Sequence, residues 1–218
     1  LPPGSSILPG VRRITGSISM TSGIRAKSLY IVATLVVSNI VGAHDDESFR
    51  VLMEAFAGVD ESRVAYSEIK SLGILESTLE QSGILIYSAP ETVIREIRKP
   101  VTETYAIIGH TVQIMKGGEE ERIDLDAVPL LMAFIESFRA TLSGNIKRLG
   151  EHYHLDFIGN GTNWKLSLRP RNPELAAFVD SIVFTGRYTR IEEILISETG
   201  GDWSRMSLVP IVEAGDDP

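Results

Sequence analysis

Residues 79–100 read LEQSGILIYSAPETVIREIRKP, and this stretch decides which fold the sequence predicts. It contains two runs in which apolar residues recur at alternate positions, and Pro90 and Pro100 mark the ends of these runs. A period of two is typical of β-strands, and proline is disfavoured in their interior. Similar short runs, separated by glycine and proline, fill residues 64–81 and 101–116. The pattern therefore predicts an antiparallel meander of strands joined by hairpins.

The first run carries apolar side chains on both of its faces. Ile84 and Ile86 lie on one side of the predicted strand, whereas Leu85 and Tyr87 lie on the other. A strand of this kind contacts a nonaqueous environment on each face. Helices that cover one face completely would give an ordinary filled core, and helices that cover it incompletely would leave an apolar cavity. The pattern alone leaves both arrangements open.

Three segments have the periodicity of helices. The clearest is residues 126–142, DAVPLLMAFIESFRATL, where Asp126 can cap the helix and Pro129 lies in the first turn. Shorter helices are predicted for residues 48–58 and 173–181. The runs between the helices predict about nine to eleven strands. Because the helices are inserted between groups of strands, the sequence predicts an α+β fold, with one large antiparallel sheet and helices on one face.

Residues 20–43, MTSGIRAKSLYIVATLVVSNIVGA, have the organisation of a secretory signal peptide. Arg25 and Lys27 give a positive start, a mostly apolar run of 13 residues follows, and small residues end the segment. An uncleaved membrane anchor is the alternative, but a span needs roughly 20 apolar residues. Residues 1–19 precede a plausible initiator methionine and are excluded from the fold. We expect residues 44–218 to form a single exported domain.

Composition narrows the function further. Residues 44–218 carry 17 basic and 29 acidic side chains, a net charge of −12, which disfavours binding to nucleic acid. The chain has no cysteine, so it has no thiol nucleophile and no lipid-carrying cysteine after the signal peptide, and we expect a soluble protein. His152 and His154 have no third ligand near them in the sequence. No nucleophile elbow or phosphate loop occurs. We therefore expect no catalytic residue, no metal site and no cofactor.

The order of these motifs resembles the outer-membrane lipoprotein carrier family, the LolA-like proteins. Within residues 79–100, the matching positions are Gly83, Leu85, Pro90 and Pro100. The stretches that resemble a divergent branch of the family are residues 124–155, 163–172 and 196–208. The resemblance implies an incomplete antiparallel β-barrel that curls around an apolar cavity and is closed by a helical lid. It also implies a protein that carries lipoproteins or lipids across the periplasm by burying their acyl chains in that cavity.

The implied cavity and lid give candidate binding residues. The cavity candidates, all on the predicted sheet, are Leu85, Tyr87, Val93, Arg95 and Ile97. The lid candidates, all on predicted helices, are Phe49, Leu52, Leu130, Phe134 and Phe138. A typical carrier has an arginine before the first proline that hydrogen-bonds the lid, and this chain has Ala89 at that position. Arg95 on the next strand is a candidate substitute, and a solvated strand residue is the alternative.

We therefore expect a periplasmic carrier of a Gram-negative bacterium that takes lipid or acylated protein cargo toward the outer membrane. Its expected partners are an inner-membrane donor transporter and an outer-membrane acceptor, and we expect a monomer. The main alternative is an envelope regulatory domain that resembles RseB-like sensors, although such a protein is expected to have an extra C-terminal domain. An accessory protein that processes acyl chains is a third alternative, for which the sequence offers no nucleophile or base.

Overall fold

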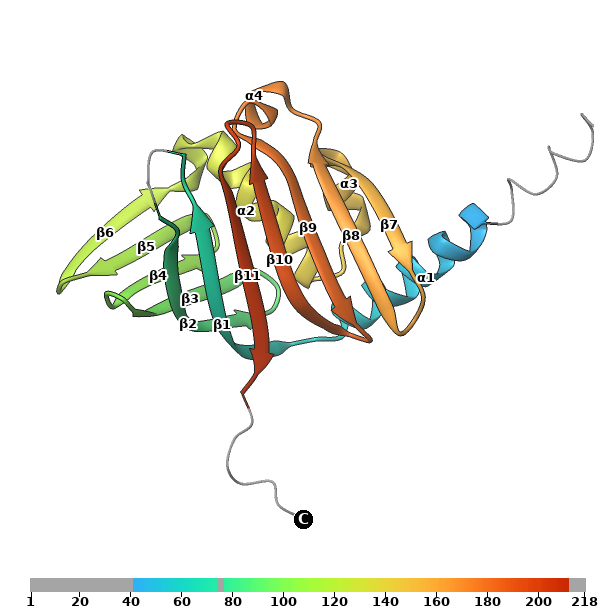
Figure 1. Ribbon diagram of the computed structural model, residues 1–218, viewed down its shortest axis with the longest axis horizontal. Coiled ribbons are helices and arrows are strands. Elements are labelled where there is room, and N and C mark those ends of the chain that lie inside the picture. The colour runs from blue at the N-terminus through green and yellow to red at the C-terminus, as the bar shows by residue number, and fades with distance from the viewer. Residues whose placement is uncertain (1–40, 74–76, 212–218) are drawn as a thin grey trace, which may run out of the picture. The chain divides into compact units, whose positions relative to one another are not determined.

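The computed structural model describes residues 41–73 and 77–211 (Figure 1). The predicted upstream residues 1–19 and signal peptide 20–43 lie outside this part of the chain, except for the last three residues of the signal peptide. In the described ranges, no helix combines the length and the apolar character that crossing a membrane requires.

The described residues form one antiparallel sheet of eleven strands, ordered β6-β5-β4-β3-β2-β1-β11-β10-β9-β8-β7. The strands are β1 (Glu61–Ser71), β2 (Leu79–Ser88), β3 (Thr92–Lys99), β4 (Glu103–Ile108), β5 (Thr111–Lys116), β6 (Glu119–Asp124), β7 (Tyr153–Gly159), β8 (Asn163–Pro170), β9 (Val179–Arg187), β10 (Arg190–Glu198) and β11 (Trp203–Pro210). Strands that follow one another in the sequence are paired, except β6 and β7, and the first strand, β1, also pairs with the last, β11. The sheet does not close, because β6 and β7 are its two edges. The predicted α+β class and incomplete barrel are confirmed.

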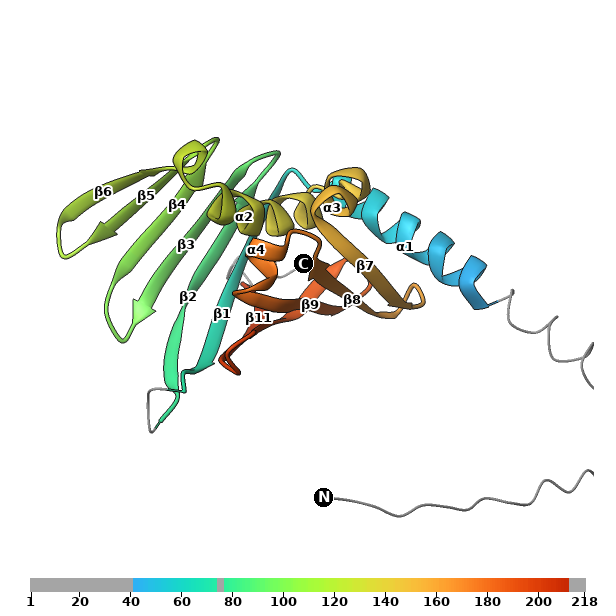
Figure 2. The same cartoon turned by 90° about the horizontal axis from the view of Figure 1, so that it is seen from above.

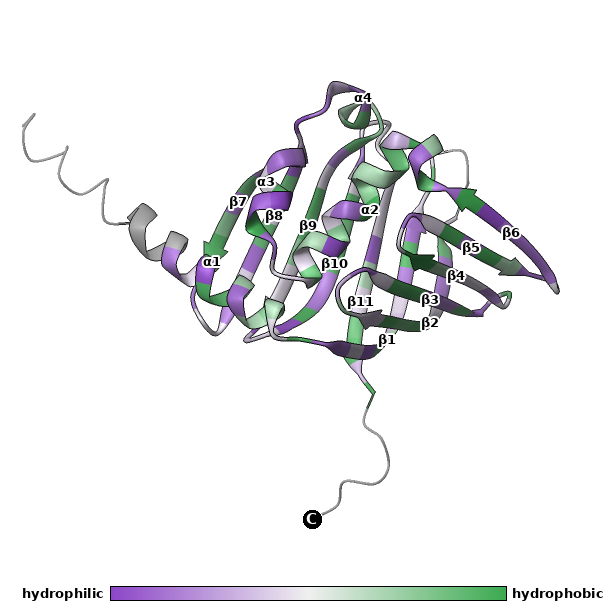
Figure 3. Ribbon diagram, turned by 180° about the vertical axis from the view of Figure 1, so that it is seen from behind, coloured by the Kyte–Doolittle hydropathy of each residue, from purple (hydrophilic) through white to green (hydrophobic). Residues whose placement is uncertain are grey.

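The helices lie on one face of the curved sheet, behind the strands in Figure 1 and in front of them in Figure 3. They are α1 (Val41–Ala57), a 3₁₀ turn η1 (Leu125–Ala127), α2 (Pro129–Leu142), α3 (Ile146–His152) and α4 (Pro173–Ala176). Helix α1 begins earlier than predicted, since no proline interrupts residues 41–47. Asp126 does not cap α2, because Asp124 caps η1 first by accepting from the Asp126 N–H at 3.0 Å. Helix α4 ends earlier than predicted, at Ala176, because the chain enters β9 at Val179.

The sequence does not predict helix α3, because Gly144 signals the end of a helix. Gly144 does end α2, with a positive φ of 65°. Asn145 then caps a new helix by accepting a hydrogen bond from the Arg148 N–H at 3.0 Å. A helix stop followed at once by a helix start makes a tight corner, and α3 folds back against α2 (Figure 2).

The helices and the sheet enclose two separate hydrophobic cores. The large core lies between the helices and β7–β10, and its largest fully buried members are Met53, Leu149, Tyr153, Leu166, Leu168, Ile182 and Phe184. The small core lies under η1 and the start of α2, where Leu125 and Ile135 pack against Val112 of β5. The strands between these two regions are β1, β2, β3 and β11. Tyr66, Tyr87 and Ile97 on these strands are buried but belong to neither core.

Helix α2 joins the two cores because it has two apolar sides. Phe134 and Phe138 are four residues apart and pack against the large core, where the Phe138 ring lies 5.7 Å from that of Phe184. Leu131 and Ile135 are also four residues apart, and they belong to the small core. Since adjacent positions differ by about 100° around a helix, these two rows face different parts of the sheet. Helix α2 thus bridges the strands between the cores.

The α2–α3 corner gives a stability prediction at Gly144. A Cβ there would lie 1.9 Å from the Met53 carbonyl oxygen of α1, and the positive φ would add strain. We expect Gly144→Ala to lower the free energy of unfolding by about 2 kcal/mol or more, measured by urea denaturation. Gly150→Ala is the matched control, because a Cβ on Gly150 of α3 meets nothing within 4 Å. The control should be neutral or stabilising by about 0.5–1 kcal/mol, and equal losses in both variants would contradict the packing at the corner.

Candidate functional site

A half-open cavity of about 1320 Å³ lies between α2 and the concave face of the sheet. Its walls come from strands in the middle of the sheet, and its roof includes the underside of α2. All five cavity candidates from the sequence line it: Leu85, Tyr87, Val93, Arg95 and Ile97. The cavity lies over the strands between the two hydrophobic cores, and it extends to side chains of both cores, such as Phe184 and Val112.

The strand register explains why these five side chains meet on one face. Leu85 of β2 pairs with Arg95 of β3, and Tyr87 pairs with Val93. Gly83 pairs with Ile97, after a register shift between Ser82 and Gly83. A Cβ on Gly83 would lie 1.8 Å from the Glu96 carbonyl oxygen, so only glycine permits this close approach of the two strands.

The lid candidates divide into two groups. Leu130, Phe134 and Phe138 of α2 line the cavity. Phe49 and Leu52 of α1 do not line it, because α1 packs over β7 at the far end of the sheet. There the Phe49 ring lies 5.1 Å from that of Phe157, and Leu52 is a buried member of the large core. The structure therefore places these two residues in the core and not in a lid.

Arg95 is the centre of a polar cluster in the cavity wall. Its Nε donates to the Tyr66 hydroxyl at 3.1 Å, and its Nη2 donates to Gln81 Oε1 at 2.9 Å and to Glu68 Oε2. Its guanidinium also lies 5.0 Å above the centre of the Tyr66 ring. Burial lowers the pKa of Arg95, but Glu68 and Tyr66 outweigh burial and leave the pKa raised, so the side chain stays charged.

Glu68 is a buried member of this cluster, with 3 % of its surface exposed. Ser204 of β11 donates its hydroxyl hydrogen to Glu68 Oε1, and Lys70 Nζ lies 3.5 Å from the same oxygen. Both carboxylate oxygens therefore have polar partners, as a buried charge requires. Strands β1, β2, β3 and β11 each contribute a side chain to this cluster, which ties the middle of the sheet together.

Tyr87 places a hydroxyl in a different part of the wall. Its Oη is buried and makes no hydrogen bond with another described residue. Burial is the main reason that the pKa of Tyr87 is raised, and the nearby Asp60 carboxylate raises it further. The hydroxyl therefore stays protonated at neutral pH, and the apolar body of the side chain faces the cavity.

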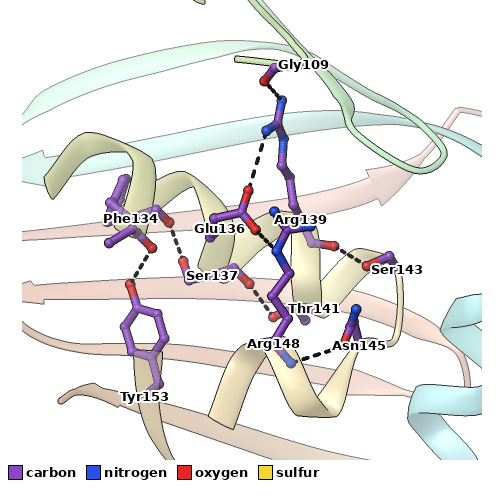
Figure 4. A network of polar contacts seen from close by, with 11 residues as sticks. Gly109, Phe134, Glu136, Ser137, Arg139, Thr141, Ser143, Asn145, Arg148 and Tyr153 are labelled. Carbon is purple, nitrogen blue, oxygen red and sulfur yellow. Dashed lines mark hydrogen bonds and ion pairs between the residues drawn. The ribbon is translucent and has the colours of Figure 1, made fainter. Parts of the chain in front are cut away.

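A second buried polar network holds the outer side of α2 (Figure 4). Arg139 donates through Nη2 to the Gly109 carbonyl oxygen in the β4–β5 turn at 2.6 Å. Glu136 lies 3.5 Å from Arg139 Nη1 and 2.5 Å from Nε of Arg148 in α3. The Tyr153 hydroxyl of β7 donates to the Ala133 carbonyl oxygen at 3.1 Å. Helix α2 is therefore bonded to the sheet at two positions, Ala133 and Arg139, and to α3 through Glu136.

These contacts show what replaces the arginine that the resemblance implies at Ala89. Ala89 itself offers only backbone groups, and its N–H donates to the Asp60 carbonyl oxygen at 2.8 Å. Arg95 does not substitute for it, because the hydrogen-bond partners of Arg95 all lie on β1 and β2. Arg95 is also not a solvated strand residue, since its side chain is only 23 % exposed. The hydrogen bond that joins helix and sheet is instead donated by a helix residue, Arg139 of α2, to Gly109 in the β4–β5 turn.

Sequence reasoning missed the residues that surround Arg95 and those that anchor α2. The run VAYSEIKS offered one signal, because Glu68 falls at the same alternate positions as Val64 and Tyr66. A carboxylate on an apolar strand face requires partners, and Lys70 on the same strand and Arg95 on the cavity face of β3 were both available cations. Arg139 gave no comparable signal, since its acceptor is a backbone carbonyl 30 residues away.

The arrangement suits binding and contains no assembled metal site. In the described part of the chain, no group of three or more histidine, aspartate or glutamate side chains could hold a metal ion. The cavity wall combines a broad apolar surface with several polar side chains, among them the compact cluster around Arg95. This combination can bind a molecule that has a long apolar part and a small polar part.

The structure is thus an open, curved antiparallel sheet that holds an apolar cavity under a helix. Residues 47–214 match the family model described as outer membrane lipoprotein carrier protein LolA-like. The chain belongs to this family, and the resemblance found in the sequence is confirmed. None of the curated proteins matches the chain significantly.

Solved structures with a similar arrangement share little sequence with this chain. A LolA superfamily protein of Nitrosomonas europaea is 9 % identical with a TM-score of 0.43, covering 78 % of this chain and 96 % of its own. A putative outer membrane lipoprotein-sorting protein domain of Vibrio parahaemolyticus is 9 % identical with a TM-score of 0.44. The match covers 80 % of this chain and 95 % of the Vibrio chain. A chain of the MucA/MucB complex from Pseudomonas aeruginosa is 11 % identical with a TM-score of 0.43. The match covers 77 % of this chain and 59 % of the Pseudomonas chain.

The α2 network gives a prediction at Arg139. Arg139→Met removes the bond to Gly109 and leaves the buried Glu136 with one cation fewer. Breaking a buried pair is strongly destabilising, so we expect a loss of about 3 kcal/mol in the free energy of unfolding by urea denaturation. Arg122→Met on β6 removes an exposed pair with Glu120 and should cost less than about 1 kcal/mol. Equal effects would mean that Arg139 does not anchor α2.

Proposed function

We propose that this protein binds a lipid, or the acyl chains of a lipoprotein, in the cavity under α2 and carries it through the periplasm toward the outer membrane. The observation that supports this proposal most directly is the cavity of about 1320 Å³, which the protein's own side chains leave unfilled. Pockets for small ligands are usually about 300–1,000 Å³, so this space suits a large, elongated apolar ligand. Membership of the LolA-like family supports the same assignment.

The free energy of binding would come from burying methylene groups. Each buried methylene contributes about 0.8 kcal/mol, so a 16-carbon chain gains on the order of 10 kcal/mol before the costs of association. No covalent step is needed, and the proposal assigns the chain no catalytic residue and no cofactor. Release then depends on a partner that binds the cargo more tightly, such as an outer-membrane acceptor. An inner-membrane transporter would supply the cargo.

Native mass spectrometry tests the proposal directly. The protein, exported and purified from a Gram-negative host without detergent, is expected to retain bound molecules with the mass of a lipid or an acylated peptide. Gentle activation should release them as apolar species that liquid chromatography can identify. A protein that emerges at its own mass only, and that takes up no lipid from added vesicles, would contradict the proposed function.

A pair of substitutions on one strand locates the binding face. Val93→Trp places a large side chain in the cavity, whereas Ile94→Trp places the same side chain on the opposite face of β3. If the tryptophan in the cavity displaces two methylenes of the ligand, the affinity for a fluorescent fatty acid should fall about tenfold. Binding by the Ile94 variant should equal that of the unchanged protein. The reverse order of effects would place the ligand on the convex face.

A further inference from the structure

We propose that the polar cluster around Arg95 binds the anionic head group of a single-chain lipid whose acyl chain occupies the cavity. The head group would be a carboxylate or a phosphate. This inference rests on the proposed function and names the class of ligand within it. Three features of the cluster support it: its net charge, its uncommitted hydrogen-bond donors and its position in an apolar wall.

The cluster has a net charge of +1, because it contains two cations and one carboxylate. Arg95 and Lys70 are both cations, and Glu68 is the single carboxylate that both of them contact. A ligand with one negative charge would therefore balance the cluster.

Other carboxylates near the cavity do not cancel this excess charge. Glu103 on β4 forms its own ion pair with Lys116 at 2.6 Å, and Glu192 on β10 pairs with Arg187 at 2.8 Å. Glu198 also lines the cavity, but it is exposed at the end of β10, so water and dissolved ions screen its charge. The positive charge at the cluster thus stays available to a ligand.

Arg95 retains donors that no described residue uses. A guanidinium has five N–H groups, and the hydrogen bonds of Arg95 to Tyr66, Glu68 and Gln81 involve only Nε and Nη2. The two N–H groups on Nη1 have no hydrogen-bond acceptor among the described residues. Lys70 Nζ adds further donors, since its only described contact is Glu68 at 3.5 Å. Arginine and lysine donors at one place suit carboxylate or phosphate oxygens.

The apolar surroundings strengthen the attraction. Val93 and Ile97 flank Arg95 on β3, and Ile107 and Ile114 of the neighbouring strands line the same cavity. A charge interaction in such surroundings is worth more than one in bulk water. Because these apolar groups begin directly beside the guanidinium, an acyl chain attached to the bound anion would enter the cavity at once.

Displacement of a neutral dye by three amphiphiles with the same chain tests the inference. The full protein is loaded with 1-N-phenylnaphthylamine, and dodecanoate, dodecanol and dodecyltrimethylammonium are titrated against it at pH 8. We expect dodecanoate to bind roughly tenfold more tightly than dodecanol, as one charge-assisted hydrogen bond would give. The trimethylammonium compound should bind most weakly. Dodecyl phosphate is titrated in the same way, and whichever of dodecyl phosphate and dodecanoate binds with the higher affinity identifies the preferred head group.

Two substitutions in the cluster should change this preference in opposite directions. Glu68→Gln removes the neutralising carboxylate and should increase the preference for dodecanoate over dodecanol. Arg95→Gln removes the principal donor and should abolish the preference, so that dodecanoate and dodecanol bind to this variant with similar affinity. Arg98→Gln is the matched control, because Arg98 is an exposed residue of the same strand that does not line the cavity. Circular dichroism reports whether each variant folds. If the Arg95 variant does not fold, the result for the Glu68 variant decides the question.

The outcomes separate this inference from the proposed function. Equal binding of dodecanoate and dodecanol would overturn the head-group site and leave the acyl cavity intact. A Glu68 variant with a reduced anion preference would also overturn it, since the cluster would then act only as a structural element. Failure of the dye and of all amphiphiles to bind would overturn both proposals.

Discussion

The packing of α2 into two hydrophobic cores at once is the constraint on which the rest of the structure depends. One row of its side chains, with Phe134 and Phe138, belongs to the large core, and another row, with Ile135, belongs to the small core. Because α2 is packed into both cores, it cannot also pack directly against the strands that lie between the cores. The protein therefore keeps an unfilled space over β1–β3 and β11 because of how its cores are placed.

The two polar networks stabilise opposite walls of that space. On the helix side, Glu136 and Arg139 are both almost fully buried, and moving α2 away from the sheet would break the bond to Gly109. Separating buried charges from their partners is costly, so α2 is better described as a fixed roof than as a loose flap. Exchange of a ligand is then easier through the open ends of the cavity. Phe178 lines the cavity and is 62 % exposed to solvent.

Much of the sheet follows from the sequence, because strand periodicity and turn residues are local signals. The alternation that puts Val93 and Arg95 on one face is a geometric property of any strand, and the register bears it out. Helix periodicity shows which residues share a side but not what covers that side. The resemblance implied a lid position for Phe49, whereas this residue packs on β7. The partners of Arg95 and Arg139 depend on pairing between distant segments, which no local pattern specifies.

The open sheet leaves β6 as a free edge, and its composition has a consequence for self-association. The strand begins with Glu119, Glu120 and Glu121, all exposed. A second copy that added its own β6 to this edge would bring two rows of carboxylates within a strand spacing of each other, and like charges opposite one another are destabilising. Edge-to-edge polymerisation is thus opposed by repulsion at neutral pH, and this protection weakens as rising ionic strength screens the carboxylates.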